Sequence, residues 1–210
     1  MNQLLTRGNN HVFICGITRS GKTYFVKNAV AQLKDPAIFF NIQEETLPDI
    51  FLKCNESTDT DVIMQHLKAG GKINFVFSPL CNLVNIMSII AYLIRQIMAA
   101  GFSERRPVYI IIDEAQLLTG SGKAAAIDCS TRGLVKGCRL ICISQRPALV
   151  DKTIYTQAFE QYLFRLSTAE SAYLKNKGIN YDECKRLWNQ NGQHSYCYFN
   201  GVDLIGHKAI

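Results

Sequence analysis

Short runs of apolar residues, each long enough for one β-strand, recur along this chain and alternate with segments of helical length. The runs are His11–Cys15, Ala37–Ile42, Ile73–Phe77, Val108–Ile112 and Arg139–Ile143. The segments of helical spacing between them are Lys22–Leu33, Asp61–Lys68, Asn82–Ala100 and Ala124–Val135. Strands that are apolar almost throughout are typical of a parallel sheet covered by helices on both faces. The pattern therefore predicts a three-layer α/β sandwich with a mostly parallel sheet.

The pattern changes after Pro147, where the spacing predicts one further strand, two helices and a hairpin. These elements are a strand at Gln161–Leu166, helices at Ala169–Lys177 and Tyr181–Asn189, and alternating segments at His194–Phe199 and Val202–His207. The dipeptide Asn200-Gly201 between the two alternating segments is a strong hairpin signal. Since no linker rich in Pro, Gly or Ser interrupts the 210 residues, we expect a single domain over residues 1–210.

Composition narrows the class of protein. Hydrophobic residues make up 48% of the chain, which excludes a disordered or collagen-like protein. The net charge of +6 permits a nucleic-acid partner without identifying one. The eight cysteines include no CxxC pair, so we expect buried free thiols in a reducing intracellular environment, no zinc site and no signal for secretion. Polar residues interrupt the apolar stretch Leu83–Met98, so we expect a buried helix there, with membrane contact as the lesser alternative.

The sharpest motif is GITRSGKT, which follows an expected strand, precedes an expected helix and fits GxxxxGK[ST] at every fixed position. Gly16 and Gly21 allow the backbone to turn so that successive N–H groups face phosphate oxygens. Lys22 is placed to reach the β- and γ-phosphates, and the Thr23 hydroxyl is placed to bind Mg²⁺. We therefore expect ATP and Mg²⁺ as ligands. The expected nucleotide contacts are Gly16, Ile17, Thr18, Arg19, Ser20, Gly21, Lys22, Thr23 and Tyr24.

A second glycine-rich stretch, Gly120–Lys123, resembles half of such a motif. It lacks the first glycine at the required offset, and Ala124 stands where the magnesium-binding hydroxyl would be. We expect a flexible loop there.

Polar residues also follow two of the expected strands. Asp113 and Glu114 come directly after Val108–Ile112, and an acid at the carboxyl end of a buried strand lies beside the phosphate loop. Asp113 is therefore a candidate ligand of Mg²⁺, and Glu114 a candidate to orient or deprotonate water, which favours hydrolysis over transfer to a second substrate. Gln145 follows Arg139–Ile143 and is placed to sense the γ-phosphate; a polar residue opening a turn before Pro147 is the simpler alternative.

Together, GITRSGKT, VYIIIDEAQ and TRGLVKGCRLICISQRP resemble the HerA/FtsK branch of P-loop ATPases. More narrowly, the chain resembles the genome-packaging ATPases of membrane-containing icosahedral viruses and phages with double-jelly-roll capsids. The resemblance implies a P-loop sheet of the additional-strand, catalytic-glutamate type. It assigns the phosphate and magnesium contacts to Lys22 and Thr23, the Walker B acid to Asp113, the catalytic acid to Glu114 and the polar sensor to Gln145.

The resemblance also implies an arginine that acts on the neighbouring subunit. Arg132 matches its position, and Arg146 is the rival; a plain surface arginine is the alternative for either. Such an arginine implies a homo-oligomeric ring of five or six subunits around double-stranded DNA, with capsid vertex proteins as further partners, in the virion or the host cytoplasm. Movement of the loop Thr119–Lys123 would couple hydrolysis to DNA through Lys123, and Arg105 and Arg106 form a second candidate DNA patch.

The function predicted from the sequence is an ATPase that translocates double-stranded viral DNA into a preformed capsid. The first alternative is a cellular, plasmid or filamentous-phage-assembly translocase of the same superfamily, which would also hydrolyse ATP but would serve a different biological process. A small nucleotide kinase and a non-enzymatic, nucleotide-gated subunit are the alternatives from other classes.

Overall fold

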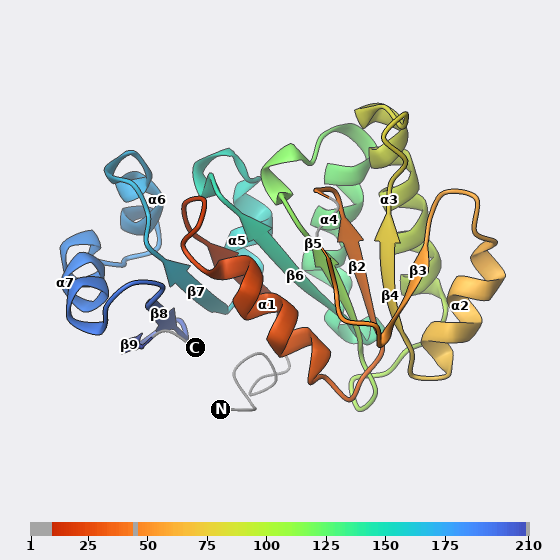
Figure 1. Ribbon diagram of the computed structural model, residues 1–210, viewed down its shortest axis with the longest axis horizontal. Helices are drawn as coiled ribbons and strands as arrows, with labels where there is room; N and C mark the ends of the chain where they lie inside the picture. Colours follow the sequence, from red (N-terminus) through yellow and green to blue (C-terminus); the bar gives the residue numbers. More distant parts are fainter. Residues whose placement is uncertain (1–9, 44–45, 209–210) are drawn as a thin grey trace.

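The computed structural model of the protein describes residues 10–43 and 46–208. Its strands are β1 (Val12–Cys15), β2 (Ala37–Asn41), β3 (Phe51–Cys54), β4 (Lys72–Val76), β5 (Val108–Ile112), β6 (Cys138–Ser144), β7 (Glu160–Phe164), β8 (Tyr196–Phe199) and β9 (Leu204–His207). Within the described residues they form one nine-stranded sheet, in the order β3-β4-β2-β5-β6-β1-β7-β8-β9 (Figure 1). Strands β1 to β7 are parallel to one another, and β8 and β9 continue the sheet as an antiparallel hairpin beside β7. The predicted mostly parallel α/β sheet with a C-terminal hairpin is confirmed.

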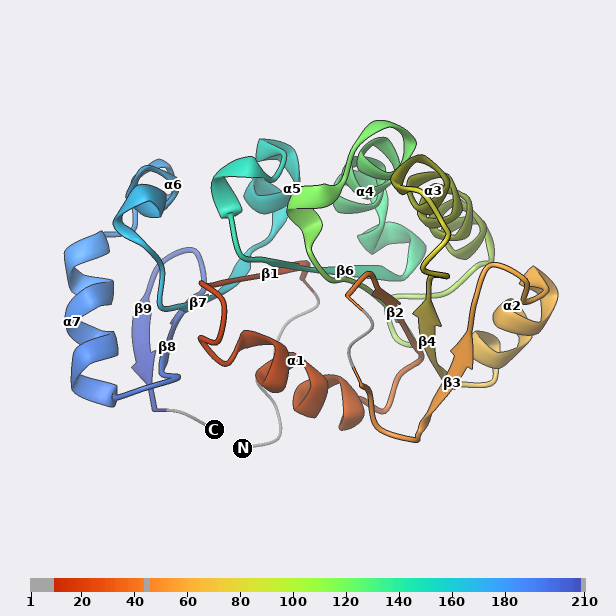
Figure 2. The ribbon, with the colours of Figure 1, turned by 45° about the horizontal axis from the view of Figure 1, so that its top comes forward.

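Helices cover both faces of this sheet. They are α1 (Lys22–Ala31), α2 (Thr60–Lys68), α3 (Leu83–Ala99), α4 (Gly120–Arg132), α5 (Lys152–Gln157), α6 (Ser171–Asn176) and α7 (Tyr181–Asn191). Figure 2 shows α1 on one side of the sheet and α3, α4 and α5 on the other. A separate core fills each side, with Phe25 and Val26 of α1 in one and Ile90 and Ile94 of α3 in the other. The arrangement is therefore a three-layer sandwich.

The strands of the middle of the sheet are apolar because both of their faces are buried. In β5, all five residues are buried. Tyr109 and Ile111 face the core beside α1, whereas Ile110 and Ile112 face the core beside α3. Successive side chains of a strand point to opposite faces, so a strand between two layers of helices needs an uninterrupted apolar run.

Helix α3 accounts for the apolar stretch that raised the question of a membrane. Its buried residues recur every three or four positions and are Met87, Ile90, Ala91, Leu93, Ile94 and Ile97. This spacing gives the helix one apolar face, which packs on the sheet. Among the described residues, no helix combines the length and the apolar character that crossing a membrane requires.

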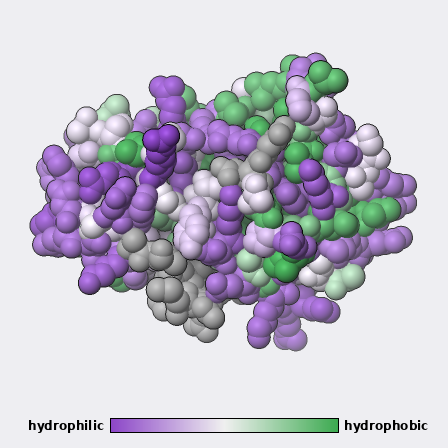
Figure 3. Space-filling view, viewed as in Figure 1, coloured by the Kyte–Doolittle hydropathy of each residue, from purple (hydrophilic) through white to green (hydrophobic). Residues whose placement is uncertain are grey.

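The beginning of α3 differs from the rest of the helix because its apolar side chains are exposed. Leu80, in the loop directly before α3, is 95% exposed, and Val84, in the first turn of α3, is 73% exposed. Figure 3 shows apolar side chains gathered over this end of α3. Because α3 follows the loop after β4, this patch lies at the carboxyl edge of the parallel strands.

The segment Gly120–Lys123 is helical rather than a flexible loop, which corrects the expectation from its glycines. Helix α4 begins at Gly120, and a Cβ added to Gly122 would lie 2.7 Å from the Sδ of Met87. The glycine therefore lets α4 approach α3 closely. This packing outweighs the low helix propensity of glycine, which costs about 1 kcal/mol relative to Ala.

Two other elements were not predicted from the sequence. Strand β3 is short, lies at the edge of the sheet and exposes its two central residues, Leu52 and Lys53, so it lacks the continuous apolar run of a buried strand. Helix α5 has six residues, too few for a visible period. The helix predicted at Ala169–Lys177 is divided into a 3₁₀ turn, Thr168–Glu170, and α6. Strand β5 has the predicted bounds, and the ends of the other predicted strands lie within two residues of the predicted ends.

The eight cysteines are free thiols, and all except Cys81 are buried. Burial raises the pKa of the Cys15, Cys138 and Cys142 thiols, so they remain protonated and pack as small apolar groups. Cys15 is of particular interest because it ends β1 directly before the phosphate loop.

A buried histidine makes the stability of the sheet depend on pH. His11 lies directly before β1, and its Nδ1 accepts a hydrogen bond of 2.9 Å from the backbone N–H of Leu140 in β6. Burial, followed by the positive charge of Arg139, lowers the pKa of His11 from 6.5 to about 4. Since the folded protein holds the neutral imidazole, its contribution to stability is complete above pH 6.5 and is lost as the pH falls toward 4.

Replacing His11 with Leu should flatten the dependence of the unfolding free energy on pH between about 6.5 and 4. The variant lacks the proton that the unfolded wild type takes up, a linkage of at most about 1.4 kcal/mol per pH unit. Urea unfolding of both proteins at several pH values measures the two slopes. Equal slopes would contradict the assignment, even if the variant is less stable at neutral pH because the Leu140 N–H has lost its acceptor.

Candidate active site

The motif of residues 16–23 forms the turn between β1 and α1. The backbone of Gly21 has φ +98°, and that of Arg19 has φ +62°. A Cβ added to Gly16 would lie 2.6 Å from the Cβ of Phe164 and 2.6 Å from the Oγ of Ser20. The two glycines of the motif are thus required for different reasons, Gly21 for its left-handed backbone and Gly16 for lack of space.

The lysine and threonine of the motif begin helix α1. Lys22 is buried, and its Nζ donates to the backbone carbonyl of Ile17 at 3.5 Å, so its side chain reaches back across the loop. Thr23 is half-buried in the first turn of the helix. No acidic residue lies in that first turn, so the positive end of the helix dipole is not neutralised locally. This is the geometry of an anion site at a helix N-terminus.

Two acidic residues lie at the carboxyl end of β5, close to this loop in the sheet. Strand β6 is inserted between β5 and β1, as the additional-strand class requires. Asp113 is 2% exposed and Glu114 is 3% exposed. The backbone N–H of Glu114 donates to Asp113 Oδ1 at 3.0 Å. Glu114 has a left-handed backbone, with φ 54° and ψ 48°, a conformation uncommon for a residue other than glycine and found at functional turns.

A chain of hydrogen bonds joins the phosphate loop to Glu114. The hydroxyl of Thr18 donates to Gln145 Oε1 at 2.5 Å, and Gln145 Nε2 donates to Glu114 Oε1 at 2.5 Å. On the other side, Gln116 Nε2 donates to Glu114 Oε2, and the Ser144 hydroxyl donates to Gln116 Oε1 at 2.7 Å. The structure therefore brings the predicted residues Thr18, Glu114 and Gln145 together. It adds Gln116 and Ser144, which sequence reasoning missed.

Two cavities border the phosphate loop on the side of the C-terminal segment. The larger, of about 460 Å³, is lined by Ile17, Thr18, Arg19, Ser20, Arg165, Asn189, Gly192, Gln193 and His194. The smaller, of about 230 Å³, is lined by Gly21, Tyr24, Phe25, Phe164 and His194. His194 lines both cavities and has a left-handed backbone, with φ +64°. It lies so close to the loop that a Cβ added to Gly21 would be 3.1 Å from the Cβ of His194. A nucleotide with its phosphates on the loop has room here for its nucleoside.

The basic residues singled out in the sequence are not gathered at this site. Arg132 is the last residue of α4 and forms an ion pair with Asp128. Lys123 forms an ion pair of 3.1 Å with Asp151, so it is engaged within the chain. Arg146 follows Gln145 directly and is exposed. Of these residues, Arg146 adjoins the hydrogen-bond chain through its neighbour in sequence.

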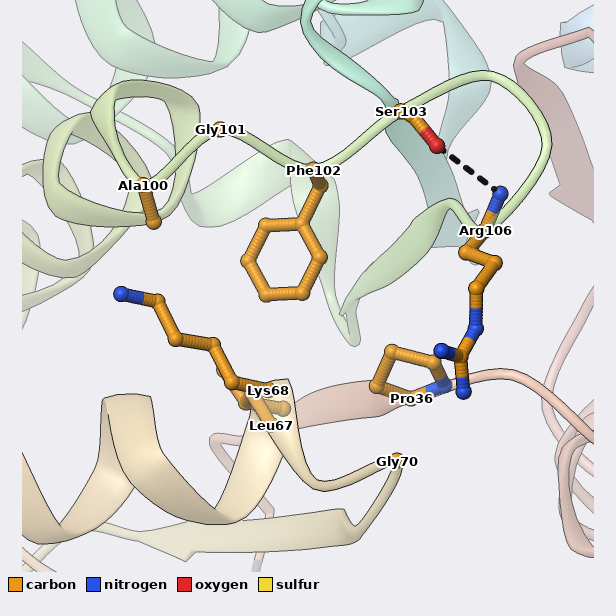
Figure 4. A pocket seen from close by; sticks show the side chains of 9 residues that line it. All are labelled: Pro36, Leu67, Lys68, Gly70, Ala100, Gly101, Phe102, Ser103 and Arg106. Atoms are coloured by element: carbon orange, nitrogen blue, oxygen red, sulfur yellow. Dashed lines mark hydrogen bonds between the residues drawn. The ribbon is translucent and has the colours of Figure 1, made fainter.

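A further cavity, of about 280 Å³, lies at the opposite edge of the sheet, where α2 and α3 end and where β2 and β5 begin. Figure 4 shows the ring of Phe102 projecting into it, with Lys68 and Arg106 to either side. The backbone N–H of Arg106 donates to the Ser103 hydroxyl at 3.3 Å. Since the phosphate loop lies at the carboxyl edge of the strands, this cavity is separate from the phosphate site.

Comparison with known proteins identifies the family. Residues 5–146 match the model of the AAA domain family. The chain belongs to the AAA domain family. No curated protein matches the sequence.

Solved structures share the fold of this AAA domain. The genome packaging NTPase B204 from Sulfolobus turreted icosahedral virus 2, in complex with AMPPCP, has a TM-score of 0.67 at 16% identity, and the match covers 97% of this chain and 99% of that chain. B204, the DNA-packaging ATPase from Sulfolobus turreted icosahedral virus, has a TM-score of 0.65 at 18% identity, over 100% of both chains. The bacterial conjugative coupling protein TrwB has a TM-score of 0.65 at 9% identity, over 96% of this chain and 85% of that chain. The expected resemblance to P-loop ATPases with genome-packaging members is confirmed at the level of the fold.

Replacing Gly16 with Ala should weaken nucleotide binding by more than about tenfold, because the added methyl group displaces the loop that holds the phosphates, and each 1.4 kcal/mol lost is tenfold in affinity. Titration with a fluorescent ATP analogue measures the effect. Gln65→Ala is the control, since Gln65 is exposed on α2 and the substitution leaves the phosphate loop and its glycines untouched. Equal affinity of the two variants would show that the loop tolerates the methyl group.

Proposed function

We propose that this AAA protein hydrolyses ATP and uses the energy to translocate double-stranded DNA into a viral capsid. The observation that carries the hydrolytic part is the buried carboxylate of Glu114, which follows Asp113 at the end of β5 and is joined to the phosphate loop through Gln145. A carboxylate in this position acts on water rather than on a second substrate. Its place is what separates this proposal from a nucleotide kinase.

The residues of the site fit ATP and Mg²⁺. The loop of residues 16–23 and Lys22 would hold the phosphates, while the hydroxyl of Thr23 and the carboxylate of Asp113 are the hard oxygen ligands that Mg²⁺ prefers. The metal ion would neutralise charge on the β- and γ-phosphates. Tyr24 and His194 line the smaller of the two cavities beside the loop and would flank the nucleoside.

Glu114 would take a proton from water while the oxygen of that water forms a bond to the γ-phosphorus. The bond between the γ-phosphorus and the oxygen that bridges to the β-phosphate breaks, which releases ADP and phosphate. Lys22 would remain on the phosphate oxygens, and Gln145 would orient the water or the γ-phosphate. Exclusion of bulk water by the buried surroundings of Asp113 and Glu114 strengthens these interactions.

The translocation part of the proposal is supported by the structural likeness to B204 over the full length of both chains. A ring of five or six copies around the DNA, capsid vertex proteins as partners, and a place in the virion or host cytoplasm belong to the same proposal. The net charge of +6 per subunit would give such a ring a sequence-independent attraction for DNA. The exposed apolar patch at the start of α3, including Leu80 and Val84, lies on the phosphate edge and suits contact with a second copy.

A second candidate is a cellular or plasmid translocase, because TrwB matches the fold with a similar TM-score. Its chemistry would be the same, and only the DNA and the partners would differ.

Replacing Glu114 with Gln should reduce ATP turnover by about 10²- to 10⁴-fold, the usual contribution of a general base. Nucleotide binding should persist, because the amide fills the same space and the loop is untouched. Phosphate release and equilibrium binding are the two measurements. Glu183→Gln, at an exposed position of α7, is the matched control and should keep wild-type turnover. Unchanged turnover in Glu114→Gln would overturn the assignment.

Double-stranded DNA should stimulate the ATPase, and the stimulation should fall as salt increases, since the protein would bind the phosphates of the DNA backbone.

If Arg105 and Arg106 bind that backbone, replacing both with Ala should reduce the slope of log affinity against log salt by about two, or about one for each phosphate that is no longer neutralised. Arg186→Ala, on the exposed face of α7, is the control. Absence of stimulation at every salt concentration would count against a translocase, and an unchanged slope would remove Arg105 and Arg106 from the interface.

A further inference from the structure

The carboxylate of Glu114 is held by two arms of the same chemical design. In each arm a hydroxyl donates to the oxygen of a glutamine amide, and the N–H of that amide donates to one carboxylate oxygen. One arm runs from Thr18 through Gln145 to Oε1, and the other from Ser144 through Gln116 to Oε2. Both oxygens of the buried carboxylate therefore accept an amide N–H, and every donor in the two arms points toward the negative charge.

The two arms differ in what anchors them. Ser144 is fully buried at the end of β6, its carbonyl accepts the backbone N–H of Gly16 at 3.2 Å, and its hydroxyl also accepts the N–H of Arg146 at 3.1 Å. Thr18, in contrast, is exposed on the loop that would receive the phosphates. The arm through Gln116 is thus rooted in the sheet. The arm through Gln145 is rooted in the part of the protein that a nucleotide contacts.

This difference matters because water must reach a carboxylate oxygen for hydrolysis. As long as Gln145 donates to Oε1 and Gln116 to Oε2, each oxygen already accepts one amide N–H, which leaves one lone-pair site on each oxygen and makes the carboxylate a weaker base toward water. A phosphate on the loop would compete for the Thr18 hydroxyl and for the amide of Gln145, and so would weaken the arm through Gln145. It has no comparable route to Ser144, whose side chain is inside the protein.

We propose that Gln116 is a positioning residue that keeps Glu114 aimed at the phosphate site while Gln145 exchanges its bond for the nucleotide or the water. Nucleotide binding then frees Oε1, and Gln116 prevents the released carboxylate from turning away. Gln116 also supports the left-handed backbone of Glu114, which has φ 54°. The inference rests on the proposed hydrolysis and adds a residue and an order of events to it.

The kinetic test separates kcat from KM. Gln116→Leu keeps the volume and removes the donor, so kcat should fall by about 10- to 100-fold, the equivalent of one hydrogen bond to a charged group, while KM for ATP stays within about twofold. Gln116→Asn retains an amide on a shorter side chain and should recover part of the loss. Gln157→Leu, at an exposed position near the end of α5, is the matched control with wild-type kinetics.

Ser144→Ala should lower kcat in the same direction and by less, because the amide of Gln116 is left in place without its anchor. The inference would be overturned if Gln116→Leu had the same kcat as the control Gln157→Leu. A rise in KM with unchanged kcat would overturn it as well. In either case Glu114→Gln would still reduce turnover by about 10²- to 10⁴-fold if the proposed hydrolysis is right. The failure of the inference is thereby distinguished from the failure of the function.

A second test needs no catalysis. Urea unfolding of Gln116→Leu, Glu114→Leu and the double variant gives a double-mutant cycle for the contact. If Gln116 holds Glu114, the changes in the unfolding equilibrium constant should be non-additive by at least about fivefold, since residues in contact couple whereas distant ones add to within about twofold. Additive effects would show that the two side chains do not support one another and would overturn the inference, whether or not the protein hydrolyses ATP.

Discussion

The hydrogen bond from the backbone N–H of Gly16 to the carbonyl of Ser144 joins the beginning of the phosphate loop to the end of β6, and the site depends on it. It continues the parallel pairing of β1 with β6, in which Cys15 lies beside Ser144. Beyond this point the two strands separate: β1 leads into the phosphate loop and α1, and β6 leads into Gln145. Because the carboxyl ends of parallel strands share one edge, polar side chains from distant parts of the sequence meet there without a dedicated binding domain.

Burial of charge is the second constraint, and it explains why the site contains so many amides and hydroxyls. Lys22, Asp113 and Glu114 are all buried, and an ionised group removed from water must be hydrogen-bonded or paired. Glu114 meets this requirement with two glutamines, which are neutral. A cation in their place would hold the carboxylate more tightly and compete with its action on water. Neutral donors bind a carboxylate less strongly than a cation does, which suits the exchange of partners proposed for Gln145.

The sequence was sufficient to predict the central strands, the phosphate loop and the pair Asp113 and Glu114, because each follows from a local pattern or from the place where a buried strand ends. Gln116 could not be found in this way. Its side chain returns to Glu114 only because Glu114 adopts a left-handed backbone and Ala115–Leu117 form a 3₁₀ turn. A pattern that reads Asp-Glu-Ala-Gln gives the residues and not the turn.

Other features depended on contacts between segments far apart in the chain. His194 approaches Gly21 across some 170 residues, through a left-handed turn after α7 that carries no strong motif. The start of α4 also depends on a distant contact, since Gly122 lies against Met87 of α3 with no room for a side chain. In both cases the sequence shows the glycine, whereas the residue that packs against it follows only from the tertiary structure.

The position of Arg132 has a consequence for how such an ATPase would assemble. Helix α4 begins just beyond Glu114, at the carboxyl edge of the sheet, and its 13 residues carry the chain about 20 Å away at 1.5 Å per residue. Arg132 therefore lies near the opposite edge, where β6 begins, and cannot reach the phosphate loop of its own chain.

An arginine finger at this position would have to serve a neighbour whose phosphate edge packs against this end of α4. Such a contact joins two different surfaces and is heterologous, the kind that closes into a ring when the rotation between subunits permits. Arg146, beside Gln145 on the phosphate edge, makes no such demand. The choice between the two arginines is thus a choice between two subunit interfaces.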